Sequence, residues 1–169
     1  MLRPLQLPTK YSGKFWLSAM PGRFEQLEEF FGWCQTDRVE EVVCLVSNEE
    51  IEEISPDYRF ASEAKRLPFS FTQFPVPDYD VPANAQGLID LSRQIEGILR
   101  HGRRIVVHCA AGHGRTGLFV TLILLAAGLT LEYALAVVRA AGSNPETESQ
   151  NAFLKDVERE KGEASRGGA

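Results

Sequence analysis

The sequence predicts an α/β fold in which a central, mostly parallel sheet is covered by helices on both faces. Short apolar runs typical of buried strands alternate along the chain with longer segments of helical periodicity. Strands that alternate with helices form parallel sheets whose two faces are both buried. The length of 169 residues and the hydrophobic content of 44% suit one domain with a single core.

The predicted strands are short apolar segments: Phe15–Met20, Glu41–Val46, Ser70–Phe74 and Arg104–His108. The predicted helices fill the segments between and after them: Arg23–Gln35, Glu49–Ser55, Asp57–Arg66, Ala85–Arg100, Thr116–Ala127, Leu131–Ala141 and Glu148–Glu160. The helix over 85–100 has the clearest pattern, because Leu88, Leu91, Ile95 and Leu99 recur at helical spacing. Sheets of this kind bind ligands at the carboxyl ends of their strands, where we expect the functional residues.

We expect a single domain over residues 1–169, with loosely ordered ends at 1–13 and 161–169. The net charge of −5 argues against a non-specific nucleic-acid binder. No signal peptide is recognisable at the start. The most apolar run, Leu118–Leu129, is shorter than the ~20 residues that span a bilayer, so no membrane span is predicted. These features favour a cytoplasmic protein, and they leave its oligomeric state open.

One segment, residues 108–117, carries the chemistry: it reads His-Cys-Ala-Ala-Gly-His-Gly-Arg-Thr-Gly. It joins a predicted strand to a predicted helix, so the first free N–H groups of the helix point into the turn, where they can surround an oxyanion. Gly112 and Gly114 permit the positive φ angles that let successive N–H groups converge. Arg115 adds a planar fork suited to phosphate, and Cys109 lies in a positive field that favours the thiolate. A thiolate held against phosphate indicates a cysteine-dependent phosphatase.

Two other interpretations of this segment fit less well. Residues 112–117 also match the dinucleotide-binding pattern G-x-G-x-x-G, but that fingerprint requires a βαβ unit and an acidic residue about 20 positions further on. Here a second helical pattern follows the helix, and residues 136–140 are Ala-Val-Val-Arg-Ala. A buried cysteine beside an ordinary turn would not explain a run of His, Cys, Gly, Arg and Thr, few of which help packing.

The segment resembles the His-Cys-x5-Arg-Thr loop of the protein tyrosine phosphatase superfamily, and we call Cys109–Arg115 the signature loop. The resemblance implies that Cys109 attacks phosphorus while the Arg115 side chain and the loop amides hold the phosphoryl oxygens. It implies that Thr116 donates its hydroxyl to the Cys109 sulfur when the cysteinyl-phosphate is hydrolysed, and that His108 orients the loop. The amides concerned belong to Ala110, Ala111, Gly112, His113, Gly114 and Arg115.

Phosphate esters with poor leaving groups also need a general acid. The candidate segment, Phe74–Pro82, contains Asp78 and Asp80 and is kept extended by three prolines. Compact dual-specificity phosphatases, the branch that this chain resembles, often carry the acid four residues before a proline. Asp78 stands in that relation to Pro82, so we predict Asp78 as the acid and keep Asp80 as the alternative. The plainer interpretation is a pair of solvated turn aspartates.

Both ends of the chain resemble cyclin-dependent-kinase-associated phosphatases. Trp16–Gly22 is similar to their opening strand and turn, and Glu146–Leu154 to their Gln-Thr-x-x-Gln segment. Glu146 stands where the first Gln is usual. Gln150 keeps the second Gln, which implies a supporting role at the site, and it equally fits a helix capping box with Thr147.

The three cysteines fit a reducing compartment, and the three histidines lack metal-site spacing, so neither metal nor other cofactor is predicted. Cys34 and Cys44 are expected in the core; the alternative is a thiol that resolves an oxidised Cys109 as a disulfide.

With the resemblance, these residues predict a metal-independent phosphatase that acts on phosphotyrosine and phosphoserine or phosphothreonine in proteins through a cysteinyl-phosphate intermediate. His113 keeps a phosphoinositide or inositol phosphate open as substrate. Lipid phosphatases of the superfamily often have lysine there, and a protonated imidazole can contact a second phosphate. Ala110, the companion position, is uncharged. A phosphopeptide-binding module with vestigial catalysis is the third hypothesis, and the intact Cys109, Arg115 and Asp78 argue against it.

Overall fold

The sheet is built from five strands in the order β1-β2-β5-β3-β4, in a computed structural model that describes residues 1–167. The strands are β1 (Arg3–Pro4), β2 (Lys14–Ser18), β3 (Glu41–Cys44), β4 (Ser70–Gln73) and β5 (Arg104–His108). Neighbouring strands run parallel, except that β1 pairs antiparallel with β2. The predicted α/β class with a mostly parallel sheet is therefore confirmed.

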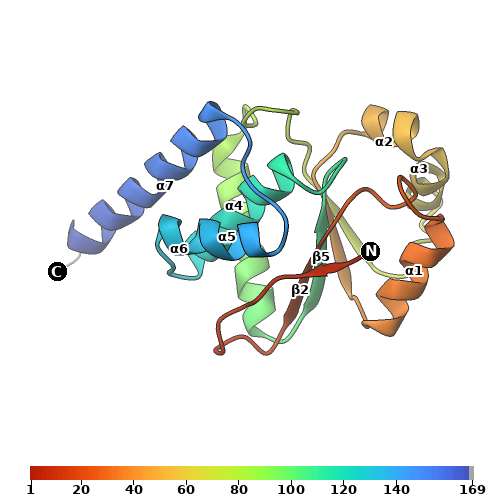
Figure 1. Cartoon of the computed structure of the whole chain (residues 1–169), viewed down its shortest axis with the longest axis horizontal. Coiled ribbons are helices and arrows are strands. Elements are labelled where there is room, and N and C mark those ends of the chain that lie inside the picture. The colour runs from red at the N-terminus through yellow and green to blue at the C-terminus, as the bar shows by residue number, and fades with distance from the viewer. Residues whose placement is uncertain (168–169) are drawn as a thin grey trace.

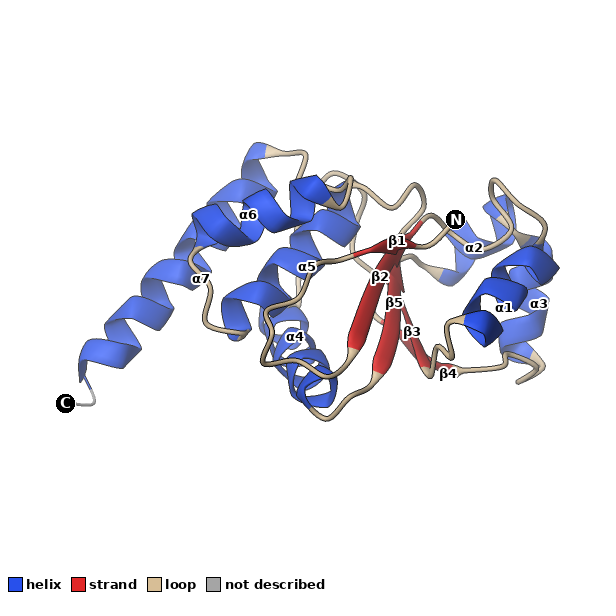
Figure 2. Cartoon of the chain, turned by 60° about the horizontal axis from the view of Figure 1, so that its bottom comes forward, coloured by secondary structure: helices blue, strands red, loops and turns tan. Residues whose placement is uncertain are grey.

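Helices cover the sheet in two layers (Figure 1, Figure 2). They are α1 (Leu27–Thr36), α2 (Asn48–Ile54), α3 (Pro56–Glu63), α4 (Ala85–Arg100), α5 (Gly114–Ala126), α6 (Leu131–Ala140) and α7 (Glu148–Gly167). The figures show α1, α2 and α3 on one side of the sheet and α4 to α7 on the other. Each face of the sheet is thus covered by helices and packs against its own hydrophobic cluster, as a buried parallel sheet requires.

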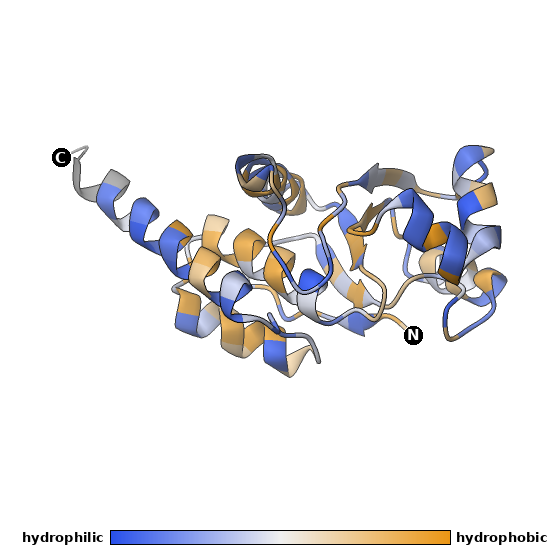
Figure 3. Cartoon of the chain, turned by 90° about the horizontal axis from the view of Figure 1, so that it is seen from above, coloured by the Kyte–Doolittle hydropathy of each residue, from blue (hydrophilic) through white to orange (hydrophobic). Residues whose placement is uncertain are grey.

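Helix α5 is the centre of the larger layer. Its residues from Gly114 to Leu125 are all buried, and α4, α6 and α7 pack around it. Hydropathy follows this arrangement: the turns of α7 nearest the C-terminus are mostly hydrophilic, whereas the helices against the sheet carry hydrophobic residues (Figure 3). None of the helices in residues 1–167 has the length and apolarity needed to cross a membrane.

Most predicted elements are observed with bounds shifted by at most three residues, and the structure differs by more in three segments. Helix α1 begins at Leu27 rather than Arg23, because Gly22 adopts a φ of +84° and Gln26 is extended. The expected loose end at 1–13 instead contains β1, whose neighbour Leu5 is buried and donates its N–H to the Phe15 carbonyl (2.9 Å). The expected loose end at 161–169 continues α7 to residue 167, and residues 168–169 lie outside the described part.

The register brings three strand ends to one level. His108, the last residue of β5, is opposite Ser18 of β2 and Cys44 of β3. The segments that leave these three strands therefore start side by side at the carboxyl edge of the sheet. The segment after β4 starts at the same edge, one strand further out. The ligand-binding edge of the fold is thus formed by the residues that the sequence singled out.

Candidate active site

The signature loop forms a turn between β5 and α5 in which most backbone amides lack a protein acceptor. From Ala110 to Arg115, the amide of Gly112 alone has an acceptor among the described residues, the Cys109 Sγ at 3.2 Å. Gly112 has a φ of +76°, the conformation that the sequence predicted for it. Free amides at the amino end of a helix form an anion-binding concavity.

The amino end of α5 also lacks a side-chain cap, unlike three other helices. Ser47, Asn84 and Thr130 accept hydrogen bonds from the first turns of α2, α4 and α6. His113 occupies the corresponding position before α5 and makes no such bond. An uncapped helix start leaves orphan N–H groups for a ligand, and here those groups lie beside Cys109.

Cys109 and Thr116 are both buried at this turn. The predicted hydrogen bond from Thr116 to the cysteine sulfur is not formed: Thr116 Oγ1 has no partner among residues 1–167, and the Gly112 amide donates to Sγ instead. The resemblance implies this bond for the hydrolysis of the cysteinyl-phosphate, so it stays a prediction. The unpaired hydroxyl keeps a proton to donate.

Arg115 is 2% exposed and is held by an acidic partner that the sequence analysis missed. Its Nη1 and Nη2 donate to the two carboxylate oxygens of Glu50 on α2, each at 2.7 Å. Burial acts to lower the pKa of Arg115, but the bonds to Glu50 and the charges of Cys109 and Asp78 outweigh it and raise that pKa. The guanidinium is therefore charged.

The hydrogen-bond pattern leaves one edge of the guanidinium available. Of its five N–H groups, two go to Glu50, and Nη1 also donates to the Val76 carbonyl at 3.4 Å. The remaining two belong to Nε and Nη2, which share one edge of the fork. Two adjacent N–H groups of this kind match two oxygens of a phosphoryl group.

His108 is fully buried behind the loop. Its Nδ1 lies 3.2 Å from the Cys109 carbonyl, and its Nε2 lies 3.0 Å from the hydroxyl of Tyr58 on α3. Burial lowers the pKa of His108 to about 4, so the ring is neutral near pH 7. Because a carbonyl only accepts, Nδ1 must carry the proton and Nε2 must accept from Tyr58. His108 is thereby anchored to both the loop and α3.

The segment after β4 places Asp78, not Asp80, against the arginine. Asp78 Oδ1 lies 3.3 Å from Arg115 Nε, and the side chain is 55% exposed. Asp80 turns back to accept from the Val81 amide at 2.8 Å. The residue between them, Tyr79, has a φ of +59°, a rare conformation for a tyrosine. This geometry favours Asp78 over the alternative.

Gln150 is fully buried and serves both of its predicted purposes in part. Its backbone N–H donates to Thr147 Oγ1 at 3.2 Å, which is one half of a capping box. Its side-chain oxygen accepts from the Glu146 amide at 2.9 Å, one residue before the position that a capping box requires. Its Nε2 donates to the Asp80 carbonyl at 3.3 Å, which ties α7 to the segment that carries Asp78.

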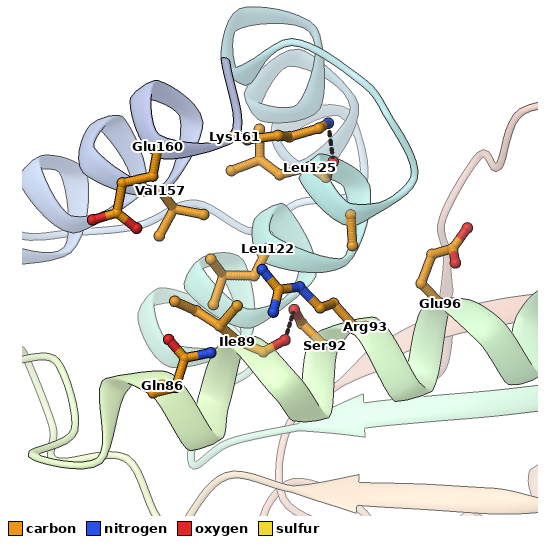
Figure 4. A pocket seen from close by; sticks show the side chains of 11 residues that line it. Gln86, Ile89, Ser92, Arg93, Glu96, Leu122, Leu125, Val157, Glu160 and Lys161 are labelled. Atoms are coloured by element: carbon orange, nitrogen blue, oxygen red, sulfur yellow. Dashed lines mark hydrogen bonds between the residues drawn. The ribbon is translucent and has the colours of Figure 1, made fainter. Parts of the chain in front are cut away.

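Two cavities differ in their relation to the signature loop. The first, about 660 Å³, lies between α4, α5 and α7, is floored by Ile89, Leu122 and Val157, and contains no loop residue (Figure 4). The second, about 270 Å³, adjoins the loop, and its lining residues are His113, Arg139, Gly142, Ser143, Asn144 and Glu146. Any substrate group beyond the phosphate on this side would meet the second cavity.

Comparison with known proteins agrees with this geometry. A family model described as "Polymorphic toxin system, DSP-PTPase phosphatase" matches residues 18–129. The chain belongs to this family. It is thus a phosphatase of the superfamily that the signature loop resembles, and the resemblance is confirmed.

Solved structures show the same fold over nearly the whole chain. A kinase associated phosphatase (KAP) in which serine replaces the catalytic-site cysteine has a TM-score of 0.80 at 16% identity, covering 95% of this chain and 94% of that one. Tk-PTP in its active form has a TM-score of 0.66 at 28% identity, with 91% and 99% covered. PTPMT1 in complex with PI(5)P has a TM-score of 0.68 at 19% identity, with 92% and 96% covered.

Proposed function

We propose that this phosphatase hydrolyses phosphotyrosine and phosphoserine or phosphothreonine in proteins through a cysteinyl-phosphate intermediate. The observation that carries the proposal is the position of Cys109 Sγ at the base of a turn whose amides, except that of Gly112, lack a protein acceptor, beside an arginine whose Nε makes no hydrogen bond to the described residues. Binding alone would need the amides and the arginine but not a thiol placed among them. The arrangement therefore supports catalysis above a vestigial binding module.

In the first step, the Cys109 thiolate attacks phosphorus, so that an S–P bond forms and the P–O bond to the leaving group breaks. Asp78, as the carboxylic acid, gives its proton to the leaving oxygen. The Nε edge of Arg115 and the loop amides stabilise the three phosphoryl oxygens. Arg115 supplies the positive charge of the site, which makes the proposed reaction metal-independent. A phosphoryl oxygen takes the place that Asp78 Oδ1 holds at Nε in the ligand-free structure.

In the second step, Asp78 is a carboxylate and accepts a proton from water. The water oxygen attacks phosphorus, the S–P bond breaks, and inorganic phosphate and the Cys109 thiolate are released. The Thr116 hydroxyl, which has no partner among the described residues, can donate its proton in a hydrogen bond to the Cys109 sulfur as the S–P bond breaks. The proton that Asp78 takes from this water restores its starting carboxylic acid.

A phosphoinositide or inositol phosphate is the second candidate substrate. The exposed His113 beside the 270 Å³ cavity favours it, because a protonated imidazole there would face a second phosphate. The carboxylate of Glu146 opposes it, since it packs against Gly114 at the start of α5. We therefore place protein substrates first.

The test is phosphate release from a matched panel in the presence of a metal chelator. The panel contains a phosphotyrosine peptide, a phosphoserine peptide and a soluble phosphoinositide, and wild type is compared with Cys109→Ser and with the buried-cysteine control Cys34→Ser. We expect turnover of the peptides that is lost only in Cys109→Ser. Preference for the phosphoinositide would replace the substrate assignment. Retained turnover in Cys109→Ser would overturn the mechanism, and tight peptide binding without release would indicate the binding module.

A further inference from the structure

Strand β1 brings a second arginine to the signature loop. Arg3 pairs with Leu17 of β2, and its side chain reaches the turn that follows β5. Figure 2 shows β1 crossing beside the end of β2. The reaction proposed above does not use this residue.

The guanidinium of Arg3 bridges two turns. Its Nη2 donates to the carbonyl of Gly112 in the signature loop, and its Nη1 donates to the carbonyl of Gly142 after α6. Both glycines have positive φ angles, +76° and +75°. A Cβ at Gly112 would lie 2.6 Å from Arg3 Nη2, and one at Gly142 would lie 3.0 Å from Nη1. The two turns are thus shaped to admit the arginine.

The bond to Gly112 has a consequence inside the loop. In a trans peptide the C=O and the following N–H point in opposite directions. When Arg3 holds the Gly112 carbonyl outward, the N–H of His113 is turned toward the interior of the loop. That N–H is one of the amides without a protein acceptor. Arg3 therefore fixes the orientation of a group that faces the phosphate position.

Arg3 also interacts with Cys109 through charge. Burial lowers the pKa of Arg3, while the negative charge of a thiolate at Cys109 acts to raise it. Arg3 therefore places a positive charge close to Cys109. Arg115 keeps N–H groups for the ligand, whereas Arg3 donates to the backbone carbonyls of Gly112 and Gly142.

We infer that Arg3 is a positioning residue of this phosphatase, which holds the signature loop in its anion-binding conformation and supplies positive charge behind Cys109. The inference rests on the proposed function only in the identity of the ligand, a phosphoryl group. Its test can therefore use inorganic phosphate and a thiol reagent, neither of which requires turnover.

The experiment compares wild type with Arg3→Gln, Arg3→Lys and a control, Arg103→Gln, whose arginine lies at the opposite end of β5 and pairs with Glu40. The first readout is the rate at which iodoacetamide alkylates Cys109 between pH 5 and 9. Cys34 and Cys44 will not interfere, because burial raises the pKa of each to about 12. The second readout is the Kd of inorganic phosphate, and thermal unfolding verifies that each variant is folded.

For Arg3→Gln we expect the alkylation rate at pH 6 to fall about threefold to tenfold, because a neighbouring positive charge that favours the thiolate is lost. We also expect the Kd of phosphate to rise about tenfold, because the His113 amide is no longer held. Arg3→Lys should restore the alkylation rate but not the Kd, since an ammonium keeps the charge without bridging both carbonyls.

A folded Arg3→Gln variant with the wild-type alkylation profile and phosphate affinity would overturn the inference. Equal changes in Arg103→Gln would also overturn it, since they would reflect net charge alone. If wild type binds phosphate and is alkylated as expected but releases no phosphate from any substrate, the proposed function fails while the role of Arg3 stands.

Discussion

The guanidinium of Arg115 faces the carboxylate of Glu50 in two parallel hydrogen bonds of 2.7 Å, between residues 65 positions apart in the sequence. This pair sets which edge of the arginine remains for a ligand. Glu50 takes one N–H of each terminal nitrogen and Val76 takes one more, so the N–H groups that remain are those of Nε and Nη2 on one edge. Glu50 does not touch the phosphate position; it acts through Arg115.

Replacing Glu50 by Gln should therefore affect both stability and turnover. The amide removes the compensating charge and leaves the buried guanidinium with a weaker partner, which should lower the free energy of unfolding by about 1–3 kcal/mol. Turnover should fall at least about tenfold, because a small displacement of a positioned group is costly. Urea denaturation and kcat/KM on a phosphotyrosine peptide would measure the two effects.

Glu53→Gln is the matched control, since Glu53 lies on the same helix and is exposed. It should change neither quantity appreciably. Wild-type turnover in a folded Glu50→Gln variant would show that Arg115 holds its position without the carboxylate.

The two aspartates after β4 can be separated by leaving-group chemistry. Asp78→Asn should lower kcat on a phosphoserine peptide by about 10²–10⁴, because an alkoxide leaves poorly without a proton. The loss should be smaller on p-nitrophenyl phosphate, whose phenolate leaves readily. Asp80→Asn should stay near wild type: each aspartate accepts from the amide that follows it, but Asp78 is the one paired with Arg115. The opposite order of the two variants would assign the acid to Asp80.

Buried His108 makes the stability of the protein depend on pH. The unfolded chain protonates this histidine near its ordinary pKa of 6.5, and the folded protein only near 4. Between these values the unfolded state binds more protons, so the free energy of unfolding should fall as the pH drops from 6.5 to 4, by up to about 3 kcal/mol. Urea denaturation at pH 7, 6 and 5 measures this slope.

His108→Asn should flatten the slope, whereas His101→Gln, which changes an exposed histidine, should keep it. Equal slopes in wild type and His108→Asn would mean that other groups govern the acid sensitivity of the fold.

The sequence predicted best those parts of the site that are continuous in the chain. Periodicity placed α4 at its observed bounds, and the strand–turn–helix pattern located the signature loop. The start of α1 was placed four residues too early, because Arg23–Gln26 have ordinary helical residue types, although the turn ending at Gly22 was recognised. Local signals of this kind are read directly from residue type and spacing.

The residues that were missed reach the loop from distant segments. Glu50 is one of several glutamates in an acidic helix, and nothing in its neighbours distinguishes it. Arg3 contacts Gly112, which lies 109 positions further along the chain. Arg3 belongs to a strand of only two residues, which is too short to show any periodicity. The strand order places β2 and β3 on either side of β5, and that order decides both contacts. The Thr116 donation belongs to the hydrolysis step and stays a prediction, since in the ligand-free loop the sulfur accepts from the Gly112 amide.

Glu146 tests the choice between protein and lipid substrates. Its carboxylate packs against Gly114, where a Cβ would clash with Oε2, and it lines the 270 Å³ cavity together with His113. A negative charge at this position should repel a second phosphate while leaving a singly phosphorylated peptide little affected. Glu146→Gln should therefore raise kcat/KM on a soluble phosphoinositide about twofold to fivefold relative to the phosphotyrosine peptide, as expected for an exposed charge pair.

Salt sharpens this test, because screening weakens interactions between exposed charges. The gain of Glu146→Gln over wild type in relative kcat/KM on the phosphoinositide should shrink as the ionic strength of the assay rises from about 0.05 to about 0.5 M. Over roughly this range the Debye length falls from above 10 Å to below 8 Å. Glu148→Gln, on the exposed first turn of α7, serves as the control. A gain in relative kcat/KM that does not depend on salt would point to a change of shape in the cavity. If Glu146→Gln leaves the ratio of kcat/KM on the two substrates unchanged, Glu146 has no part in substrate selection.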